Sequence, residues 1–425
     1  MVFVGRPALW GLSVGGEKGA KRLLEILRDE LDLTMALAGT PDVRDINSSY
    51  LTRRPAKILF YMGLSSHSHR VALQPLATKL ASLGHEITFF SPIEPTILNA
   101  NITEFCPDVL KTANDKAIKS AGDANGEEYI YAFAYLMKAK VIAFPSSATQ
   151  LPADFDVFGF PIESWFTGFY SNSYWYIPDR VFNCFHTIVS FFVYRDYHLN
   201  KMESLVKTSF NFEFPPLIEL MGKTDLVFLN EHFSAAYSRP LPQNIVPVGG
   251  IHVEASEGIL PQEIQDFLSD TDQFIYISFG SVIKVSLFPP TVQQYFFDSI
   301  KSFQGIKFLW KWEGEVPENF PENILTRSWF PQQDILAHPK CKGFITQGGQ
   351  MKTLSHSIDE LLHNRTYRDS AQEVSKRFRD RPMSALDTAV WWTEYVLRHD
   401  TSHLSSLSQD VPTIGNKISL SIVML

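Results

Sequence analysis

Two histidines lie where an apolar stretch gives way to a helical pattern. Ser66, His67, Ser68 and His69 follow the run KILFYM and precede a series of regularly spaced leucines. The partial positive charge at a helix N-terminus disfavours a protonated imidazole, so a histidine there tends to stay neutral near pH 7. A neutral imidazole is the form that a general base needs. A helix cap or a surface position accounts for the same residues, and local sequence alone favours that structural interpretation.

A second group of residues combines an aromatic ring, amides and a glycine turn. Trp329 and Gln332 belong to the run WFPQQD at the end of a predicted strand, and Gln347 and Gly349 belong to the run FITQGG. Backbone N–H groups at a Gly-Gly turn bind anions, so a diphosphate is a natural occupant. The aromatic ring can stack on a nucleobase while an amide reads its edge. A core tryptophan beside an ordinary turn explains either piece taken alone.

A weaker signal is the strand end FGSV, which contains Ser281. Its glycine lets a ligand approach the backbone, and the serine hydroxyl can hydrogen-bond a phosphate oxygen. Glycines also end many strands as turn residues. The run therefore supports a phosphate site only in combination with the second group.

The elements that would position these residues alternate between strands and helices in two blocks. The first block has a strand at Lys57–Met62, a helix whose leucines recur at spacings of three, four and three residues, and a strand at Glu86–Ser91. Gly84 is the expected helix stop. The second block comprises a strand at Phe274–Phe279, a helix at Pro290–Phe303, strands at Lys307–Trp312, Ile324–Trp329 and Gly343–Thr346, and helices from Gln350 as far as about His399.

Two such blocks predict an α/β fold with two doubly wound, Rossmann-like domains. We expect one domain over residues 55–250 and the other over residues 251–425, joined by a linker at Val246–Pro261. In open parallel sheets, ligands bind beyond the carboxyl ends of the strands. The site is therefore expected in the cleft between the two domains.

Residues 1–54 do not follow that alternation. The stretch Gly5–Leu12 is interpreted as a short strand end and loop, and Glu17–Ala38 as a helix with a leucine-rich apolar face. That helix has no evident partner within the segment.

Composition narrows the class of protein. The chain of 425 residues has 38 Lys plus Arg against 46 Asp plus Glu, and this acidic balance argues against a nucleic-acid partner. Its three cysteines, Cys106, Cys184 and Cys341, lack metal-type spacing, so we expect neither a zinc site nor a disulfide framework. The start of the chain lacks the features of a signal peptide, and no apolar stretch reaches the roughly 18 residues of a membrane span, so a soluble chain is expected.

Residues 55–425 resemble the animal UDP-glucuronosyltransferase and UDP-glycosyltransferase family. The resemblance rests on five blocks in the family's order, among them HSHRVALQPLATKLASLGHEITFFSP, FIYISFGSV and SWFPQQDILAHPKCKGFITQGG. It implies the two-domain glycosyltransferase-B fold, with the acceptor bound mainly by the N-terminal domain and the UDP-sugar by the C-terminal one. It also implies no metal or other cofactor, and a small lipophilic hydroxyl acceptor. The family resides in the endoplasmic reticulum membrane, so that location, with membrane association, and a soluble, cytoplasmic one both stay open.

The resemblance assigns roles to individual residues. The family's catalytic base falls on His69, which would accept the acceptor's hydroxyl proton in an inverting transfer, and the aspartate that orients the base falls on Asp123. A solvated acid in a loop is an equal interpretation of Asp123. On the donor side the matches are Ser281 and Gln347 with phosphate, Trp329 with the uracil ring, Gln332 as its amide partner, and Gly349 as a backbone donor.

The family's pattern breaks off after Gly349. Met351 and Ser355 replace residues that are usually polar or acidic, and Ile358 leads directly into a helix that comes much later in relatives. The intervening strand and the Asp-Gln pair that holds the sugar are absent. We therefore expect a C-terminal domain shortened after residue 358, and a shortened, catalytically impaired protein is the alternative function.

Residues 1–54 resemble the C-terminal part of the FMN-dependent 2-hydroxyacid oxidase family, through the run VFVGRPALWGLSVGGEKGAKRLLEILRDELDLTMALAGT. In that family a pair like Gly5 and Arg6 holds the FMN phosphate at the end of a barrel strand. Only the last strand and helix of such a (β/α)8 barrel would be present, without the catalytic histidine. FMN binding is therefore not expected, and oxidase activity is the least favoured hypothesis.

Overall fold

The computed structural model describes residues 6–37, 42–43, 55–63, 67–97, 99–120, 128–145, 185, 189, 193–234, 241–253, 259–280, 283–317, 320–346 and 354–404. The chain divides into two compact units, Met1–Ala56 and Lys57–Leu425. Among the described helices, none combines the length and apolar character needed to cross a bilayer.

The first unit is dominated by helix α1, Arg6–Leu37, which is kinked at Gly16, where φ is 55°. The strand end expected at Gly5–Leu12 is therefore wrong from Arg6 onward, because this stretch is already helical. A lone strand leaves its backbone N–H and C=O groups unpaired unless a neighbouring strand is present, whereas a helix pairs them within itself. With no sheet neighbour in residues 6–37, the helix is the conformation that satisfies the backbone.

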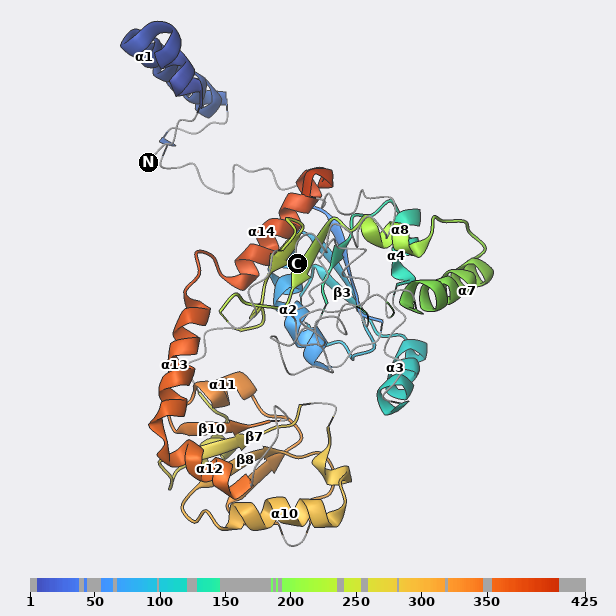
Figure 1. Ribbon diagram of the computed structural model, residues 1–425, viewed down its shortest axis with the longest axis vertical. Coiled ribbons are helices and arrows are strands. Elements are labelled where there is room, and N and C mark those ends of the chain that lie inside the picture. The colour runs from blue at the N-terminus through green and yellow to red at the C-terminus, as the bar shows by residue number, and fades with distance from the viewer. Residues whose placement is uncertain are drawn as a thin grey trace. The chain divides into compact units, whose positions relative to one another are not determined.

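The second unit begins with a three-stranded parallel sheet in the order β1-β2-β3 (Figure 1). Its strands are β1 (Lys57–Tyr61), β2 (Glu86–Phe90) and β3 (Ile102–Phe105). Helix α2, His67–Ser82, connects β1 to β2 and buries Leu76 and Leu80. Gly84 then takes a φ of 94°, and this left-handed conformation ends the helix as expected. The strand–helix–strand pattern of the first block is confirmed.

A second three-stranded parallel sheet has the order β4-β5-β6. Its strands are β4 (Ile142–Ala143), β5 (Leu226–Leu229) and β6 (Ile245–Pro247). Alternate residues of β5 serve two cores: Leu226 and Phe228 pack with α2 and β2, while Val227 and Leu229 pack with α4, α7 and α8. The helices of this part are α3 (Asp108–Ser120), α4 (Ile130–Leu136), the π-helix η3 (Tyr194–Leu199), α7 (Asn200–Phe210) and α8 (Leu217–Gly222).

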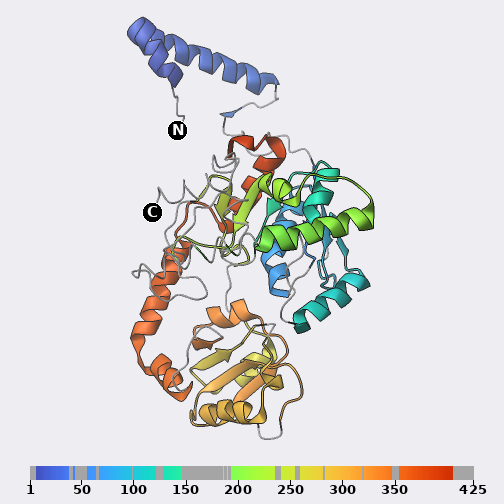
Figure 2. The same ribbon diagram turned by 45° about the vertical axis from the view of Figure 1, so that its right-hand side comes forward.

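The C-terminal sheet is parallel, with four strands in the order β10-β7-β8-β9. Its strands are β7 (Phe274–Ile277), β8 (Lys307–Lys311), β9 (Ile324–Arg327) and β10 (Cys341–Ile345). Helices α10 (Pro290–Lys301) and α12 (Leu354–His363) share a core with one face of the sheet, and α9 (Gln262–Phe267) and α11 (Gln332–Ala337) with the other (Figure 2). The α/β class with parallel sheets is therefore confirmed. Short 3-10 turns complete the order, η4 (Val285–Leu287) and η5 (Ser402–Leu404).

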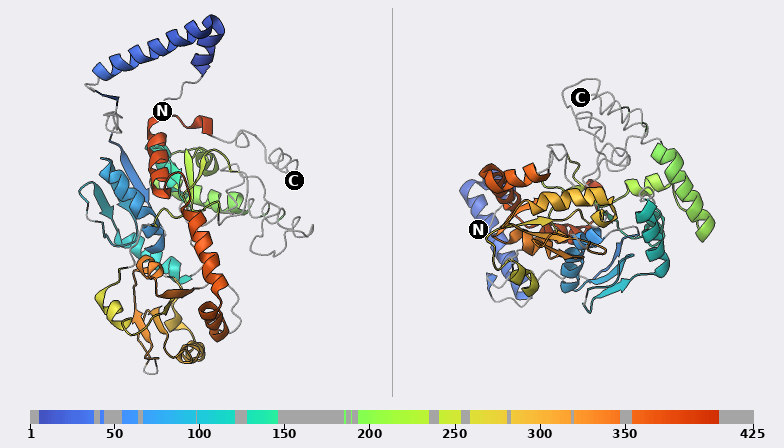
Figure 3. Two further views of the ribbon diagram at one scale, coloured as in Figure 1. Left: turned by 90° about the vertical axis from the view of Figure 1, so that its left-hand side faces the viewer. Right: turned by 90° about the horizontal axis from the view of Figure 1, so that it is seen from below.

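The last helices lead away from the C-terminal sheet. Helix α13, Arg365–Arg379, joins α12 to α14, Ala385–Arg398 (Figure 3). Helix α14 packs against α2, and its Ala389 and Val390 belong to the same core as Leu76 and Leu80. The end of the described chain therefore completes the hydrophobic core that begins with β1 and α2.

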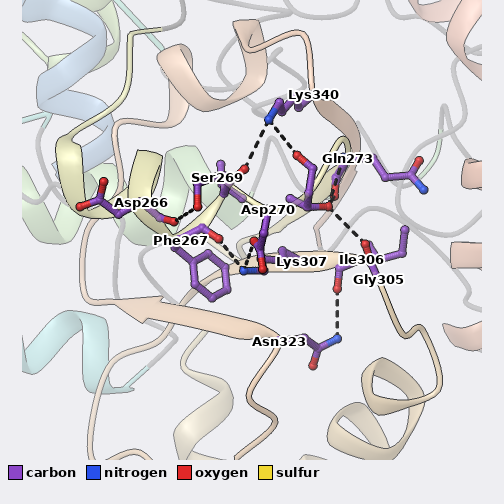
Figure 4. A network of polar contacts seen from close by, with 12 residues as sticks. Asp266, Phe267, Ser269, Asp270, Gln273, Gly305, Ile306, Lys307, Asn323 and Lys340 are labelled. Carbon is purple, nitrogen blue, oxygen red and sulfur yellow. Dashed lines mark hydrogen bonds and ion pairs between the residues drawn. The ribbon is translucent and has the colours of Figure 1, made fainter.

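The amino-terminal edge of the C-terminal sheet carries a network of polar contacts (Figure 4). Lys340 donates to the carbonyl of Thr271 at 2.8 Å, and Lys307 donates to the carbonyl of Phe267 at 2.7 Å and pairs with Asp270. Helix termini leave carbonyl groups without intrahelical partners. The two lysines supply donors to the last residue of α9 and to the segment that follows this helix. The network fastens α9 to this edge and leaves the carboxyl edge of the sheet for other contacts.

Candidate active site

The carboxyl edge of the C-terminal sheet contains a topological switch point. From β7 the chain moves to β8 and β9 on one side, and then returns to place β10 on the other side of β7. In open parallel sheets, ligands bind beyond the carboxyl ends of the strands at such a switch point, so the site is sought at the ends of β7 and β10. The turn after β7 begins with Gly280, whose φ is 82°.

The predicted base lies in the first turn of α2. This helix begins at His67, and both His67 and His69 are half-buried. Burial lowers the pKa of His69 below its ordinary value of 6.5. Burial also lowers the pKa of His67, and the positive charges of Arg70 and Lys311 lower it further. Both rings are therefore neutral at pH 7, as a general base requires.

Trp329 contacts this turn from the C-terminal sheet. It lies two residues after the end of β9, and its ring centroid is 4.6 Å from that of His67, with 60° between the ring planes. Its side chain is nevertheless 53% exposed. The structure thus brings the predicted nucleobase-stacking residue to the same turn that carries the predicted base.

Lys311 is a residue of the candidate site that the sequence analysis did not single out. Its side chain is only 7% exposed, and its ammonium lies 5.9 Å from the centre of the Trp329 ring. The same ammonium donates to the carbonyl of Gly280 at 3.0 Å and pairs with Glu313. Lys311 is the last residue of β8, so its place at a carboxyl strand end was the signal that could have identified it.

Glu313 and Lys284 complete the charges around Lys311. Lys284 lies 3.2 Å from the Glu313 carboxylate. Burial alone would raise the pKa of Glu313, but hydrogen bonds from Lys311 and Lys284 leave it below its ordinary value. The carboxylate therefore stays ionised beside two cations, and the group as a whole carries net positive charge near the switch point.

A buried ion pair anchors the turn that carries the histidines. Arg70 is 2% exposed, pairs with Glu104 on β3, and donates to the hydroxyl of Thr96 at 3.1 Å. Its guanidinium also lies 5.1 Å from the centre of the Phe89 ring. The sequence analysis did not single out Arg70. This arginine lies three residues before Leu73 on the apolar face of α2, and a charge on such a face needs a buried partner.

Other predicted site residues can be placed only in part. Gln332 is the first residue of α11 and is exposed, and its neighbour Gln333 donates to the carbonyl of His252 at 2.9 Å. Asp123, Ser281, Gln347, Gly349 and Gly5 lie outside the described residues, as does the side chain of Arg6. Their roles remain predictions from the sequence.

The expected linker is held by the last turn of α13 and by the segment that follows this helix. The ring of Phe378 lies against Gly250, where a Cβ atom would come within 2.7 Å of it, and Gly250 has a φ of 84°. Arg381 donates to the carbonyl of Gly249 at 3.2 Å. The ring of Phe378 also lies 4.3 Å from that of His232. Two successive glycines are therefore needed here for close approach of other chain segments.

Comparison of the sequence with known proteins places this chain in a family. Residues 170–354 and 350–422, more than half of the chain, match the family described as UDP-glucoronosyl and UDP-glucosyl transferase. The chain belongs to this family. The two matched segments meet at residues 350–354, next to the point where the sequence pattern departs from that of relatives.

Individual relatives are similar over different lengths. UDP-glycosyltransferase UGT5 of Dactylopius coccus is 32% identical over 50% of this chain and 49% of its own length, and UGT4 of the same organism is 28% identical over 83% and 88%. A UDP-glucuronosyltransferase of Pleuronectes platessa is 28% identical over 44% of this chain and 49% of its own length. The chain thus spans about half the length of several curated relatives that it matches. The solved UDP complex of a UDP-glucose: anthocyanidin 3-O-glucosyltransferase superimposes with a TM-score of 0.48 and 14% identity, covering 81% of this chain and 99% of that one.

The N-terminal segment matches a different family. Residues 1–53 match the family described as FMN-dependent dehydrogenase. The predicted fusion of segments from two families is therefore confirmed, and the first compact unit of the structure ends at Ala56.

Proposed function

We propose that this chain transfers a glucuronosyl or hexosyl group from a UDP-sugar to the hydroxyl of a small lipophilic acceptor. The acceptor oxygen forms a bond to the anomeric carbon, the bond from that carbon to the diphosphate breaks, and UDP leaves with the electron pair. His69 accepts the hydroxyl proton. Attack opposite to the leaving diphosphate inverts the configuration at the anomeric carbon.

One observation carries this proposal. The first turn of α2, which bears His67 and His69, lies against Trp329 beyond the carboxyl end of β9. A base must come within about 3 Å of the proton that it removes, so the acceptor hydroxyl has to lie beside this turn. A uridine stacked on Trp329 directs its diphosphate toward the same region, which brings donor and acceptor together.

The donor's diphosphate is assigned to the switch point between β7 and β10. Lys311 supplies positive charge there and holds the carbonyl of Gly280, the residue before Ser281. Ser281, Gln347 and Gly349 follow β7 and β10 in sequence, which is why we assign them to the phosphates. Gln332 would read the edge of the uracil, and Asp123 would orient His69.

Two measurements on purified protein test the proposal. Isothermal titration should show UDP binding, and incubation with a UDP-sugar and a panel of small phenols should release UDP. Changing His69→Ala should lower turnover by roughly 10²- to 10⁴-fold, the usual contribution of a general base, while UDP binding stays within about twofold. A folded wild type that does not bind UDP would exclude the transferase function.

A second candidate is a shortened protein that binds the nucleotide without transferring sugar. It is favoured by the meeting of the two family matches at residues 350–354, where a strand and the Asp-Gln pair of relatives have no counterpart in the sequence. The Asp-Gln pair holds the sugar in relatives. Its loss would leave the affinity for UDP unchanged and would remove the additional affinity that the sugar contributes. Equal affinities for UDP and UDP-sugars, with no turnover, would identify this case.

Oxidase chemistry is not proposed for residues 1–53. The described part of this segment consists mainly of the helix α1, and an FMN site in the matched family lies at the end of a barrel strand. The purified chain should therefore lack the visible absorbance of a flavin. Residence in the endoplasmic reticulum membrane remains a prediction from the family.

A further inference from the structure

The contact between His67 and Trp329 has a second consequence, which rests on the proposed function. Trp329 lies in the segment between the end of β9 at Arg327 and the start of α11 at Gln332. No described helix or strand includes it, so its backbone is not held by a hydrogen-bond ladder. Its ring needs a contact with another side chain to keep one orientation.

The two aromatic residues of this segment face different surroundings. Phe330 is 2% exposed and packs in the core formed by Tyr276, Leu309 and Ile335, whereas Trp329 is 53% exposed. Phe330 therefore anchors the segment, and its neighbour is directed outward. The outward ring meets His67 at 4.6 Å and Lys311 at 5.9 Å, and more than half of its surface stays accessible.

His67 is suited to hold this ring. It is the first residue of α2, one turn before Arg70, which the buried pair with Glu104 fixes in place. The Nδ1 atom of His67 is buried without a hydrogen-bond partner among the described residues. No hydrogen bond at this atom therefore competes with the packing of the ring against Trp329. Aromatic rings in tilted contact at this separation attract one another by more than their buried area alone.

We infer that His67 is a positioning residue for the donor nucleobase: its ring holds Trp329 in one orientation and leaves the accessible ring surface for uracil. The same helical turn carries His69 two residues later. The position of the uracil is therefore linked directly to the position of His69, the proposed general base. His67 itself touches neither the transferred proton nor the sugar.

The test compares UDP affinity among variants of the full chain by isothermal titration. His67→Ala should weaken UDP binding by roughly three- to tenfold, the value of one aromatic contact, and His67→Phe should restore most of it. His363→Ala changes a histidine whose side chain is 73% exposed at the end of α12, and should leave the affinity unchanged. In turnover assays His67→Ala should raise KM for the donor more than it lowers kcat, whereas His69→Ala should lower kcat.

A second readout follows the Trp329 ring directly. In protein labelled with 5-fluorotryptophan, the ¹⁹F resonance that disappears in Trp329→Phe identifies this ring, and His67→Ala should shift or broaden it. A wild type that binds UDP together with a His67→Ala variant of equal or higher affinity would overturn the positioning role alone. An unchanged Trp329 resonance would overturn it as well. A folded wild type that binds no UDP would instead overturn the proposed function, and the positioning role with it.

Discussion

Arg70 and Glu104 form an ion pair that is almost completely withdrawn from solvent, with side chains 2% and 6% exposed. The Glu104 carboxylate also accepts the backbone N–H groups of Thr96 at 2.7 Å and Ile97 at 3.2 Å. The pair therefore joins the first turn of α2 to β3 and to the segment that precedes it. This turn carries both histidines of the candidate site.

Arg70→Ala should destabilise the chain strongly, because it leaves a buried carboxylate without its counter-charge. Removing one partner of a buried pair costs about 3–5 kcal/mol, whereas replacing both by apolar residues of similar size is often close to neutral. Urea unfolding should show the large loss for Arg70→Ala and a much smaller one for the double variant Arg70→Met, Glu104→Leu. Equal losses in the two variants would mean that the pair is not what holds this turn.

The rate of sugar transfer should depend on pH through His69. Burial lowers the pKa of this imidazole below 6.5, and the neutral form is the active one. The rate should therefore be constant above pH 6.5 and fall as the pH decreases through the lowered pKa. Initial rates between pH 5 and 8 measure this, and a rate that falls with decreasing pH already between pH 8 and 7 would contradict the assignment.

Stability should also decrease in acid. Burial lowers the pKa of five described histidines below the ordinary value of 6.5, namely His67, His69, His232, His252 and His338. Below pH 6.5 the unfolded chain binds protons at these positions before the folded one does, so the free energy of unfolding falls as pH falls. Urea unfolding at pH 7.5 and 5.5 should give a lower value at pH 5.5. Replacing His69 with Gln should reduce the difference between the two.

Gly250→Ala should destabilise the contact between the linker and Phe378. The substitution places a Cβ within 2.7 Å of the Phe378 ring and forces alanine into a φ of 84°. Gly305 provides a matched control, because its φ is 87° but a Cβ there meets nothing within 4 Å. We expect about 1–2 kcal/mol for Gly305→Ala from the backbone alone, and about 1–3 kcal/mol more for Gly250→Ala from overpacking. Thermal unfolding of both variants measures the difference.

Lys311→Met should weaken UDP binding by roughly tenfold, because a charge-assisted hydrogen bond to the diphosphate is lost. Lys307 begins the same strand that Lys311 ends, and it contacts the opposite edge of the sheet through the Phe267 carbonyl. Lys307→Met should therefore lower stability without changing UDP affinity. Titration of both variants with UDP at low and high salt measures how much affinity each one loses. Equal losses of affinity would exclude Lys311 from the donor site.

Much of the local structure was determined by the sequence itself. The leucines of α2, the stop at Gly84 and the strands of both blocks were predictable because helix and strand periodicity depends on neighbouring residues only. The strand that leads to Trp329 was predictable for the same reason, although β9 ends at Arg327, two residues before the predicted end. The interpretation of Gly5–Leu12 as a strand end failed from Arg6 onward. A strand, unlike a helix, pairs its backbone groups with a neighbouring strand, and residues 6–37 contain none.

Only the tertiary structure decided which distant residues meet. Nothing in the sequence pairs Arg70 with Glu104, brings α14 into one core with α2, or places the ring of His67 against Trp329. These contacts depend on strand order, on the register of parallel strands and on how the last helices return to the first sheet. Periodicity along the chain specifies which face of an element is apolar, but the partner of that face is fixed by the packing of the whole unit.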